Sequence, residues 1–180
     1  MDYPGQRIQV DVKFVPSACL KNPKVIGKQF FQYTAIDEYS RWRFVEAFEE
    51  HNTYSSAMFI EHLVKAFPLP IQCIQTDNGA EFTNRFTTHR DKPTLFKVHL
   101  KQHGIRHKVI RPFTPRHNGK VERSHRKDNE RFYATHTFYS FEDFAKQLKV
   151  YNRRDYNNFP MPPLGWKSPN QVLKDYLASV

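Results

Sequence analysis

The stretch IQCIQTDNGAEF, residues 71–82, begins as a β-rich apolar run and stops on Asp77. A buried strand that ends in a solvated Asn78-Gly79 turn would account for this pattern. The turn alone explains neither the aspartate at the strand end nor the second carboxylate, Glu81, that follows so closely. The reason for an aspartate at position 77 must therefore be sought in the rest of the chain.

Three β-rich runs precede this strand. Residues 7–15, RIQVDVKFV, alternate apolar and polar side chains with the period of two that is typical of a strand, so Asp11 should stand mid-strand and face away from the apolar side. Residues 28–50 contain two further β-rich runs that break at residues 37–40. We therefore expect a hairpin or meander there.

Helical patterns fill most of the remaining chain. Apolar positions recur at helical spacing from Thr53 until Pro68 ends the pattern. A short helix is predicted from Leu95 to His103, closed by Gly104, and a fifth short strand over residues 105–110. These elements follow the three early strands in the order that an α/β protein with a mixed sheet would show.

The last third of the chain should contain a loop and two helices. Residues 111–117, with two prolines, predict a loop, and residues 118–133 predict a polar helix with an exposed face. Ser140 and Asp143 resemble a capping box at the start of another helix, which a Pro-rich tail follows. The whole chain, residues 1–180, is predicted to be one domain with a mixed five-stranded sheet flanked by helices.

Composition favours a polyanionic partner. The chain has 28 Lys and Arg against 18 Asp and Glu, a formal net charge of +10, although a soluble basic protein without such a partner would fit the charge alone. The two cysteines are far apart, which predicts neither a disulfide framework nor a Cys-rich zinc site. No apolar run suggests a signal peptide or membrane span, so we expect a cytoplasmic protein.

Three acidic residues stand out by position: Asp11 in the first strand, Asp77 at the end of the fourth, and Glu122 in the polar helix. Carboxylates that meet at strand ends suit Mg²⁺ or Mn²⁺, which prefer hard oxygen ligands. Each also has a plain structural interpretation. Asp11 could be a solvent-facing strand residue, Asp77 a turn residue, and Glu122 a surface residue paired with Arg126.

Four motifs occur in order along the chain: QVDVKF, AIDEYSRW, QTDNGAEF and RPFTPRHNGKVER. Together they resemble the catalytic core of the retroviral-integrase superfamily, closest to insertion-sequence transposases of the DDE type. The tail PPLGWKSPNQVL is similar to the end of those cores, so the resemblance covers residues 6–173. It implies a ribonuclease H-like fold and metal-dependent DNA cleavage and 3′-hydroxyl strand transfer.

The resemblance carries over residue by residue. It implies that Asp11, Asp77 and Glu122 are the catalytic residues and hold two Mg²⁺ or Mn²⁺ ions. It also implies dimers or higher assemblies that act on transposon ends and target DNA, in a bacterial cell at the nucleoid. Insertion-sequence transposases usually have an N-terminal end-binding module, and this chain begins almost at the first catalytic strand, so we expect a catalytic core without that module.

Basic and polar side chains around the predicted loop and polar helix could neutralise DNA phosphates. A solvated basic helix is the alternative. The candidate DNA-binding residues are Arg111, Arg116, His117, Asn118, Lys120, Arg123, Arg126 and Asn129. Between Asp77 and Glu122 lie 44 residues, longer than the commonest spacing of this motif, and we place the extra length in the polar segment 83–94.

Two other interpretations of function stay open. One is a DNA-binding or assembly module of the same fold without catalysis, and the other is a structure-directed nuclease that cuts without strand transfer.

The remaining acids and histidines have structural interpretations. Asp37 and Glu38 should make turn hydrogen bonds. Glu81 should orient a basic side chain or remain solvated. Asp128 and Glu130 are interpreted as surface charges. His99 and His103 are one helical turn apart, but no neighbouring cysteine pair completes a zinc site.

Overall fold

The computed structural model describes residues 1–84, 92–111 and 118–180. Its centre is a five-stranded sheet in the order β3-β2-β1-β4-β5. The strands are β1 (Ile8–Phe14), β2 (Phe31–Asp37), β3 (Arg43–Phe48), β4 (Cys73–Thr76) and β5 (Arg106–Val109). Strands β1 to β3 pair antiparallel, whereas β4 lies parallel to β1 and β5 parallel to β4. The predicted mixed sheet is confirmed.

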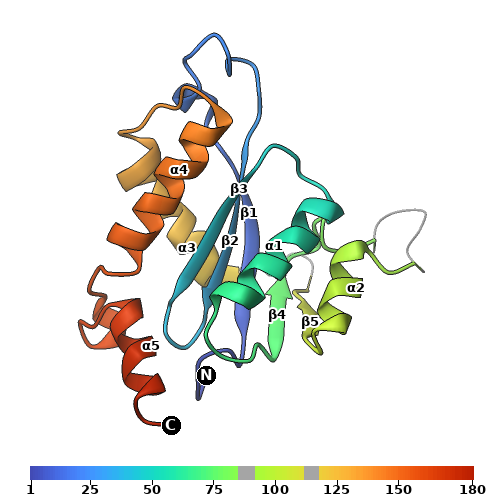
Figure 1. The fold of residues 1–180 in the computed structure, drawn as a ribbon, viewed down its shortest axis with the longest axis vertical. Helices are drawn as coiled ribbons and strands as arrows, with labels where there is room; N and C mark the ends of the chain where they lie inside the picture. Colours follow the sequence, from blue (N-terminus) through green and yellow to red (C-terminus); the bar gives the residue numbers. More distant parts are fainter. Residues whose placement is uncertain (85–91, 112–117) are drawn as a thin grey trace.

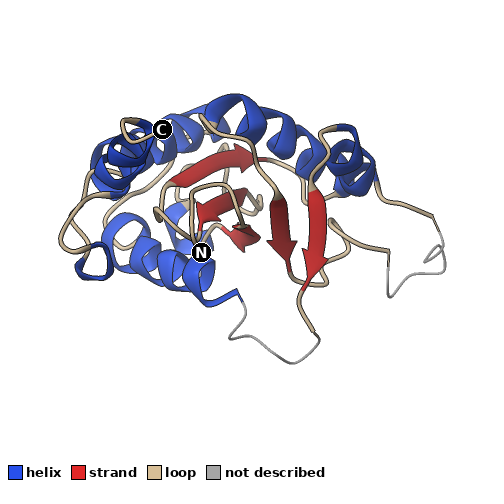
Figure 2. Ribbon diagram, turned by 90° about the horizontal axis from the view of Figure 1, so that it is seen from below, coloured by secondary structure: helices blue, strands red, loops and turns tan. Residues whose placement is uncertain are grey.

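Helices cover both faces of the sheet (Figures 1 and 2). They are α1 (Thr53–Ala66), α2 (Leu95–Gln102), α3 (Gly119–Asp128), α4 (Phe141–Tyr151) and α5 (Pro169–Leu177). Helices α1 and α2 contact each other, α3 crosses β1 and β2, and α4 packs on the edge strand β3. Asn52, Thr94 and Ser140 cap the N-termini of α1, α2 and α4 with their side chains.

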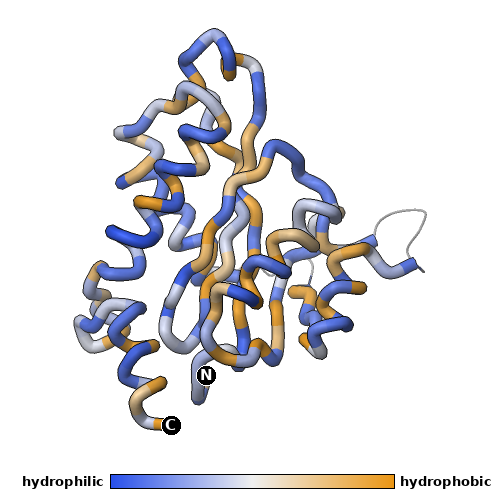
Figure 3. The backbone as a smooth tube through the Cα atoms, in the orientation of Figure 1, coloured by the Kyte–Doolittle hydropathy of each residue, from blue (hydrophilic) through white to orange (hydrophobic). Residues whose placement is uncertain are grey.

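The period of two in β1 decides which side chains meet which helices. Ile8 and Val10 belong to the main core, which also contains α1 residues such as Phe59 and Leu63. Gln9 and Asp11 therefore point to the opposite face, the one that α3 covers. Figure 3 shows the hydrophobic residues concentrated along the strands and the hydrophilic ones along the outer helices.

A second core lies beyond the end of β1. It joins Val15 and Phe30, on the segment between β1 and β2, to Phe144 and Leu148 of α4. The predicted helix over residues 118–133 is α3 followed by a π-helical turn, Asn129–Tyr133, which contributes Phe132 to this core. The chain after Glu122 is therefore packed against the fold and is not a free surface helix.

The C-terminal segment differs from the predicted Pro-rich tail. It contains helix α5, which Ser168 caps by accepting a hydrogen bond from Gln171 N, with Pro169 at the first helical position. Both residues are ordinary start signals for a helix, but the neighbouring prolines hide them in the sequence. Leu173 of α5 reaches the main core.

Within the described ranges, no helix is long and apolar enough to cross a membrane.

Candidate active site

Asp11 lies on β1, and Asp77 directly follows β4, the parallel neighbour of β1. The register of β1 and β4 pairs Ile8 with Ile74 and Gln9 with Gln75. Continued past the last residue of β4, this register would set Asp77 next to Asp11, and the negative charge of Asp77 does act on Asp11. The sheet therefore brings together two of the three acids that the sequence singled out.

The Asn-Gly turn after β4 holds Asp77 and makes room for Glu81. Asp77 Oδ1 accepts a hydrogen bond of 2.9 Å from Gly79 N, and Asn78 Nδ2 donates to Ile110 O. A Cβ at Gly79 would lie 2.4 Å from both carboxylate oxygens of Glu81, so a larger residue there would require the Glu81 side chain to move. Glu81 is buried, and its Oε1 lies 2.9 Å from His51 Nε2. Glu81 thus orients a basic side chain and is not solvated.

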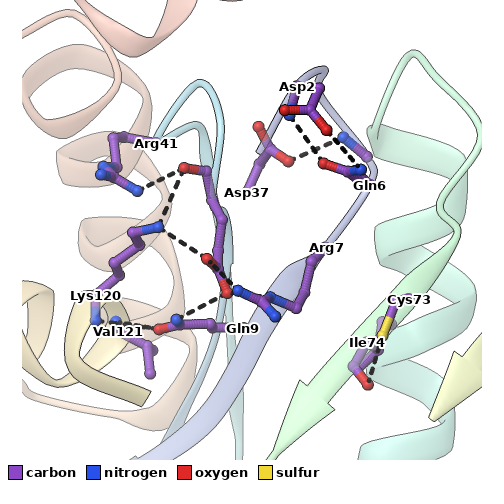
Figure 4. Close-up of polar contacts among 12 residues, drawn as sticks. Asp2, Gln6, Arg7, Gln9, Asp37, Arg41, Cys73, Ile74, Lys120 and Val121 are labelled. Atoms are coloured by element: carbon purple, nitrogen blue, oxygen red, sulfur yellow. Dashed lines mark hydrogen bonds and ion pairs between the residues drawn. The ribbon is translucent and has the colours of Figure 1, made fainter. Parts of the chain in front are cut away.

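The start of α3 is attached to β1 by Gln9. Its side-chain oxygen accepts hydrogen bonds from Lys120 N at 3.1 Å and Val121 N at 3.2 Å, so it satisfies two backbone donors of the first helical turn. Its amide nitrogen donates to Glu38, whose carboxylate also binds Arg7 and Lys120 (Figure 4). This network fixes the helix end that carries Glu122.

The other end of α3 is attached by a buried ion pair. Arg43 Nη1 lies 2.7 Å from Asp128 Oδ1, and neither side chain is exposed. Gln32 donates to Asp128, while Asn152 accepts from Arg43. The interpretation of Asp128 as a surface charge is therefore wrong: it is the buried counterion of Arg43, and it holds the last residue of α3 to β3.

Between these two attachments, His125 brings α3 against Asp11. His125 Nδ1 lies 3.5 Å from Asp11 Oδ2, and His125 Nε2 lies within hydrogen-bond distance of Thr34 Oγ1, at 2.9 Å. Burial lowers the pKa of His125 to about 3, so the imidazole is neutral at pH 7 and gives Asp11 no positive charge. Sequence reasoning missed His125, because its partners come from two strands that are far away in the chain.

The electrostatics of Asp11 connect all three acids. Burial, together with the negative charges of Asp77, Glu122 and Glu81, raises the pKa of Asp11 to about 7, against a hydrogen bond from the backbone of Val12 that lowers it. Glu122 is exposed on α3, whereas Asp11 and Asp77 are half-buried. The raised pKa of Asp11 therefore reflects both its burial and the mutual repulsion of these carboxylates.

The three acids have the donor chemistry that a hard divalent cation prefers, but the structure does not gather them into a closed metal site. Across residues 1–84, 92–111 and 118–180, no group of three or more His, Cys, Asp or Glu side chains is arranged closely enough to hold a metal ion. The three carboxylates nevertheless offer the oxygen ligands that Mg²⁺ and Mn²⁺ prefer, and a cation would remove the repulsion that acts on Asp11.

The candidate DNA-binding residues differ in their surroundings. Arg111, Arg123, Arg126 and Asn129 are exposed, and Lys120 is half-buried with its ammonium 2.8 Å from Glu38 Oε2. Asn118 is buried, and its side chain donates to Val10 O. Arg116 and His117 lie outside the described residues, as does most of the segment to which the extra length was assigned.

The structure gives the other acids and histidines structural partners. Asp37 accepts hydrogen bonds from Gly5 N and Ser40 N, which confirms its turn role. His99 Nδ1 and His103 Nε2 both lie within 2.8 Å of Glu61 Oε1. This pair is an ion-pair cluster on α1 and α2, and Glu130 is an exposed surface charge as expected.

Two family models, both described as the integrase core domain, match residues 2–115 and residues 103–169. The protein described as "Putative integrase ORF3" from Spiroplasma virus SpV1-C74 is 29% identical over 126 residues, which are 66% of this chain and 33% of that protein. The retrovirus-related Pol polyprotein from transposon RE2 of Arabidopsis thaliana is 28% identical over 144 residues, 77% of this chain and 9% of that protein. This chain thus spans a third or less of the length of these relatives.

Solved structures show the same fold. The catalytic core domain of BIV integrase in crystal form I superposes with a TM-score of 0.59 at 20% identity, over 97% of this chain and 95% of that one. A chain of the simian T-cell lymphotropic virus intasome in complex with PP2A regulatory subunit B56 gamma superposes with a TM-score of 0.64 at 15% identity, over 94% and 54%. At these identities the likeness establishes the ribonuclease H-like architecture alone.

Proposed function

This chain belongs to the integrase core domain family, and we propose that it is the catalytic core of a DDE transposase. In this proposal it cleaves a DNA phosphodiester bond at a transposon end and joins the freed 3′-hydroxyl to target DNA. Asp11, Asp77 and Glu122 are the catalytic residues. Membership of the family supports an integrase- or transposase-type core. The surroundings of Asp11, Asp77 and Glu122 support the assignment of DNA cleavage and strand transfer to these three residues.

One observation carries the proposal: Asp77 follows β4, the parallel neighbour of β1, and the negative charges of Asp77 and Glu122 both act on Asp11. The three acids come from segments that are far apart in the chain. Contacts at both ends of α3, from Gln9 and from Arg43, hold the helix that carries Glu122 against the sheet. A solvent-facing role for each acid separately does not explain this convergence.

The same three residues would hold two Mg²⁺ or Mn²⁺ ions. When bound, such ions supply Lewis acidity for an attacking and a leaving oxygen of a phosphodiester. The chain itself positions the ligands: the parallel strands fix Asp11 and Asp77, and the Gln9 and Arg43 contacts fix the helix of Glu122. His125, neutral beside Asp11, leaves that carboxylate available to a cation.

DNA would approach along the face of α3 that carries Glu122. Arg126 and Asn129 follow Glu122 at i+4 and i+7, so the three side chains share one exposed face. Arg126 can neutralise a phosphate there and Asn129 can donate a hydrogen bond, contacts that position DNA without reading its sequence. Arg111, Arg116 and His117, near the start of α3, would extend this contact, and the family implies that two copies or more act together.

The test is Mg²⁺-dependent cleavage of a duplex that ends in transposon sequence, followed by joining of a pre-cut 3′-hydroxyl end to plasmid DNA. Asp11→Asn, Asp77→Asn and Glu122→Gln should each lower both activities by about 10²–10³-fold or more, because each removes a charge that a cation needs. Glu130→Gln, an exposed acid just beyond α3, is the matched control and should keep both activities.

The outcomes separate the three interpretations. Full activity in Asp77→Asn contradicts the assignment of the acids. Salt-sensitive DNA binding by the wild-type chain without cleavage in Mg²⁺ or Mn²⁺ indicates a DNA-binding or assembly module, and cleavage without joining indicates a nuclease.

A further inference from the structure

A basic pocket lies on the side of α3 that points away from Glu122. It has a volume of about 320 Å³ and lies between α3, the β2–β3 turn and the turn near Pro162. Four cationic side chains line it, Arg41, Lys120, Arg123 and Lys127, and its apolar wall includes Tyr156 and Pro162. We call this the α3 flank pocket.

Helix geometry separates this pocket from the acidic site. Lys120, Arg123 and Lys127 are spaced i, i+3 and i+7, so they form one stripe along α3. At 3.6 residues per turn, Arg123 lies about 100° and Lys127 about 140° around the helix from Glu122. A group bound in the pocket would therefore not touch the face that carries Glu122 and Arg126.

Arg41 occupies its place in the pocket at a conformational cost. Its backbone is in the left-handed region, with φ 62°, which non-glycine residues rarely adopt. Its Nη1 donates a hydrogen bond of 2.6 Å to Glu38 O, and its side chain is half-buried. Strained residues of this kind concentrate at functional sites. Arg41 thus adds a cation to the lining of the pocket from the turn between β2 and β3.

The four cations of the pocket outnumber the ion pairs they form: Lys120 is paired with Glu38. Among the described residues, neither Arg123 nor Lys127 forms an ion pair or hydrogen bond, although like charges at i and i+4 repel. The pKa of Lys127 is lowered by burial and by the charges of Arg131, Arg123 and Arg43, which together outweigh the attraction of Glu130. Glu38 is the carboxylate that binds Lys120, and it is shared with Arg7. A bound anion would remove this repulsion.

We propose that the α3 flank pocket binds a phosphate group, and that the group is a backbone phosphate of DNA held apart from the reacting strand. The assignment of this phosphate to DNA rests on the proposed function. The ability of the pocket to bind a phosphate group does not. Arginine offers forked donors and lysine a point charge, a combination suited to phosphate oxygens. The volume lies near the lower bound of small-ligand sites, about 300–1,000 Å³, which suits one phosphodiester unit better than a larger ligand.

The first arm of the test measures duplex DNA binding by fluorescence anisotropy over a range of salt concentrations, without divalent cations. Lys127→Gln and Arg123→Ala should each lower the slope of log K against log salt by about one unit. Lys174→Ala, an exposed lysine on α5, is the matched control and should leave the slope unchanged. Thermal unfolding verifies that each variant is folded.

The second arm uses inorganic pyrophosphate and follows the amide signals of Gly119 and Lys127 by NMR. Saturable shifts in the wild type and Lys174→Ala, lost in Lys127→Gln, support the pocket. If pyrophosphate binds in this way but the DNA slope is unchanged, the source is a free phosphate compound and the DNA assignment is overturned. If Lys127→Gln alters neither arm, the proposal is wrong.

Neither arm depends on cleavage, so the two proposals fail separately. A wild-type chain that never cleaves DNA would overturn the catalytic assignment and leave the result for the pocket intact.

Discussion

Arg43 and Asp128 form an ion pair with both side chains fully buried, and they join the first residue of β3 to the last residue of α3 across 85 positions of sequence. The guanidinium also lies 3.6 Å from the centre of the Tyr156 ring. Buried charges that lose their partner are strongly destabilising, because the remaining charge is left in a medium of low polarity. This pair should therefore dominate the stability of the α3 attachment.

Asp128→Ala should lower the free energy of unfolding by about 3–5 kcal/mol, and Arg43→Ala by a similar amount. The double variant should lose clearly less than the two single losses together, since it leaves no unpaired charge. Urea unfolding of the four proteins measures this. As a control, Lys167→Ala disrupts the exposed pair with Asp175 and should change stability by less than about 1 kcal/mol. Additive losses would contradict the coupling.

Glu38 should make the free energy of unfolding decrease at acidic pH. Burial alone would raise its pKa, but hydrogen bonds from Arg7, Lys120 and Gln9 lower the pKa from 4.5 to about 2. A carboxyl whose pKa is lower in the folded state stabilises the fold above its unfolded pKa. About 3 kcal/mol should therefore be lost as the pH falls from 4.5 towards 2.

The measurement is the free energy of unfolding against pH for the wild type, Glu38→Gln and Glu130→Gln. Glu38→Gln should be less stable at pH 7 and should show a shallower loss in acid than the wild type. Parallel curves for the wild type and Glu38→Gln would argue against the prediction. Glu130→Gln removes an exposed acid and should follow the wild-type curve.

Gln9→Met should loosen the start of α3, because the variant keeps the length of the side chain but accepts no hydrogen bonds from Lys120 N and Val121 N. Loss of a comparable helix cap costs about 0.5–2 kcal/mol. Hydrogen exchange should show faster exchange at these two amides and little change in β2. Gln147→Met, on the surface of α4, should leave the α3 amides unchanged, and equal exchange in Gln9→Met would exclude Gln9 as an attachment.

Arg126→Ala tests the DNA-facing side of α3. If Arg126 contacts a phosphate, its removal should weaken DNA binding and lower the salt slope by about one unit. Arg154→Ala provides a control, since Arg154 is exposed on the segment after α4. An unchanged slope in Arg126→Ala would mean that this arginine is only a solvated surface charge.

The elements that followed from the sequence are those whose signals are local. The alternation of residues 7–15 gave β1, the break at residues 37–40 gave the hairpin, and Ser140 gave the start of α4. Asp11 could be singled out because aspartate is unusual within a strand, and Asp77 because it ends a β-rich run inside one of the four motifs. Their side-by-side placement then depended on the strand order, which the structure supplies.

What the sequence could not show are partners that are distant in the chain. Asp128 has the pattern of a surface helix residue, because nothing near it reveals Arg43. The position of Lys120 beside Glu38 and that of His125 beside Asp11 depend on how α3 crosses the sheet. Helix α5 was hidden for another reason: prolines suggest an irregular tail unless Ser168 and Pro169 are recognised as a start signal.

The two attachments of α3 also determine when during synthesis the acids can come together. A nascent chain that has emerged only as far as β5 already contains Asp11 and Asp77, but it has neither Glu122 nor the counterion of Arg43. The backbone of Arg43 still awaits Asn157, whose side chain bonds to both its N–H and its C=O. The complete acidic set therefore forms only after nearly the whole domain has left the ribosome, and truncated products of translation or proteolysis would not contain it.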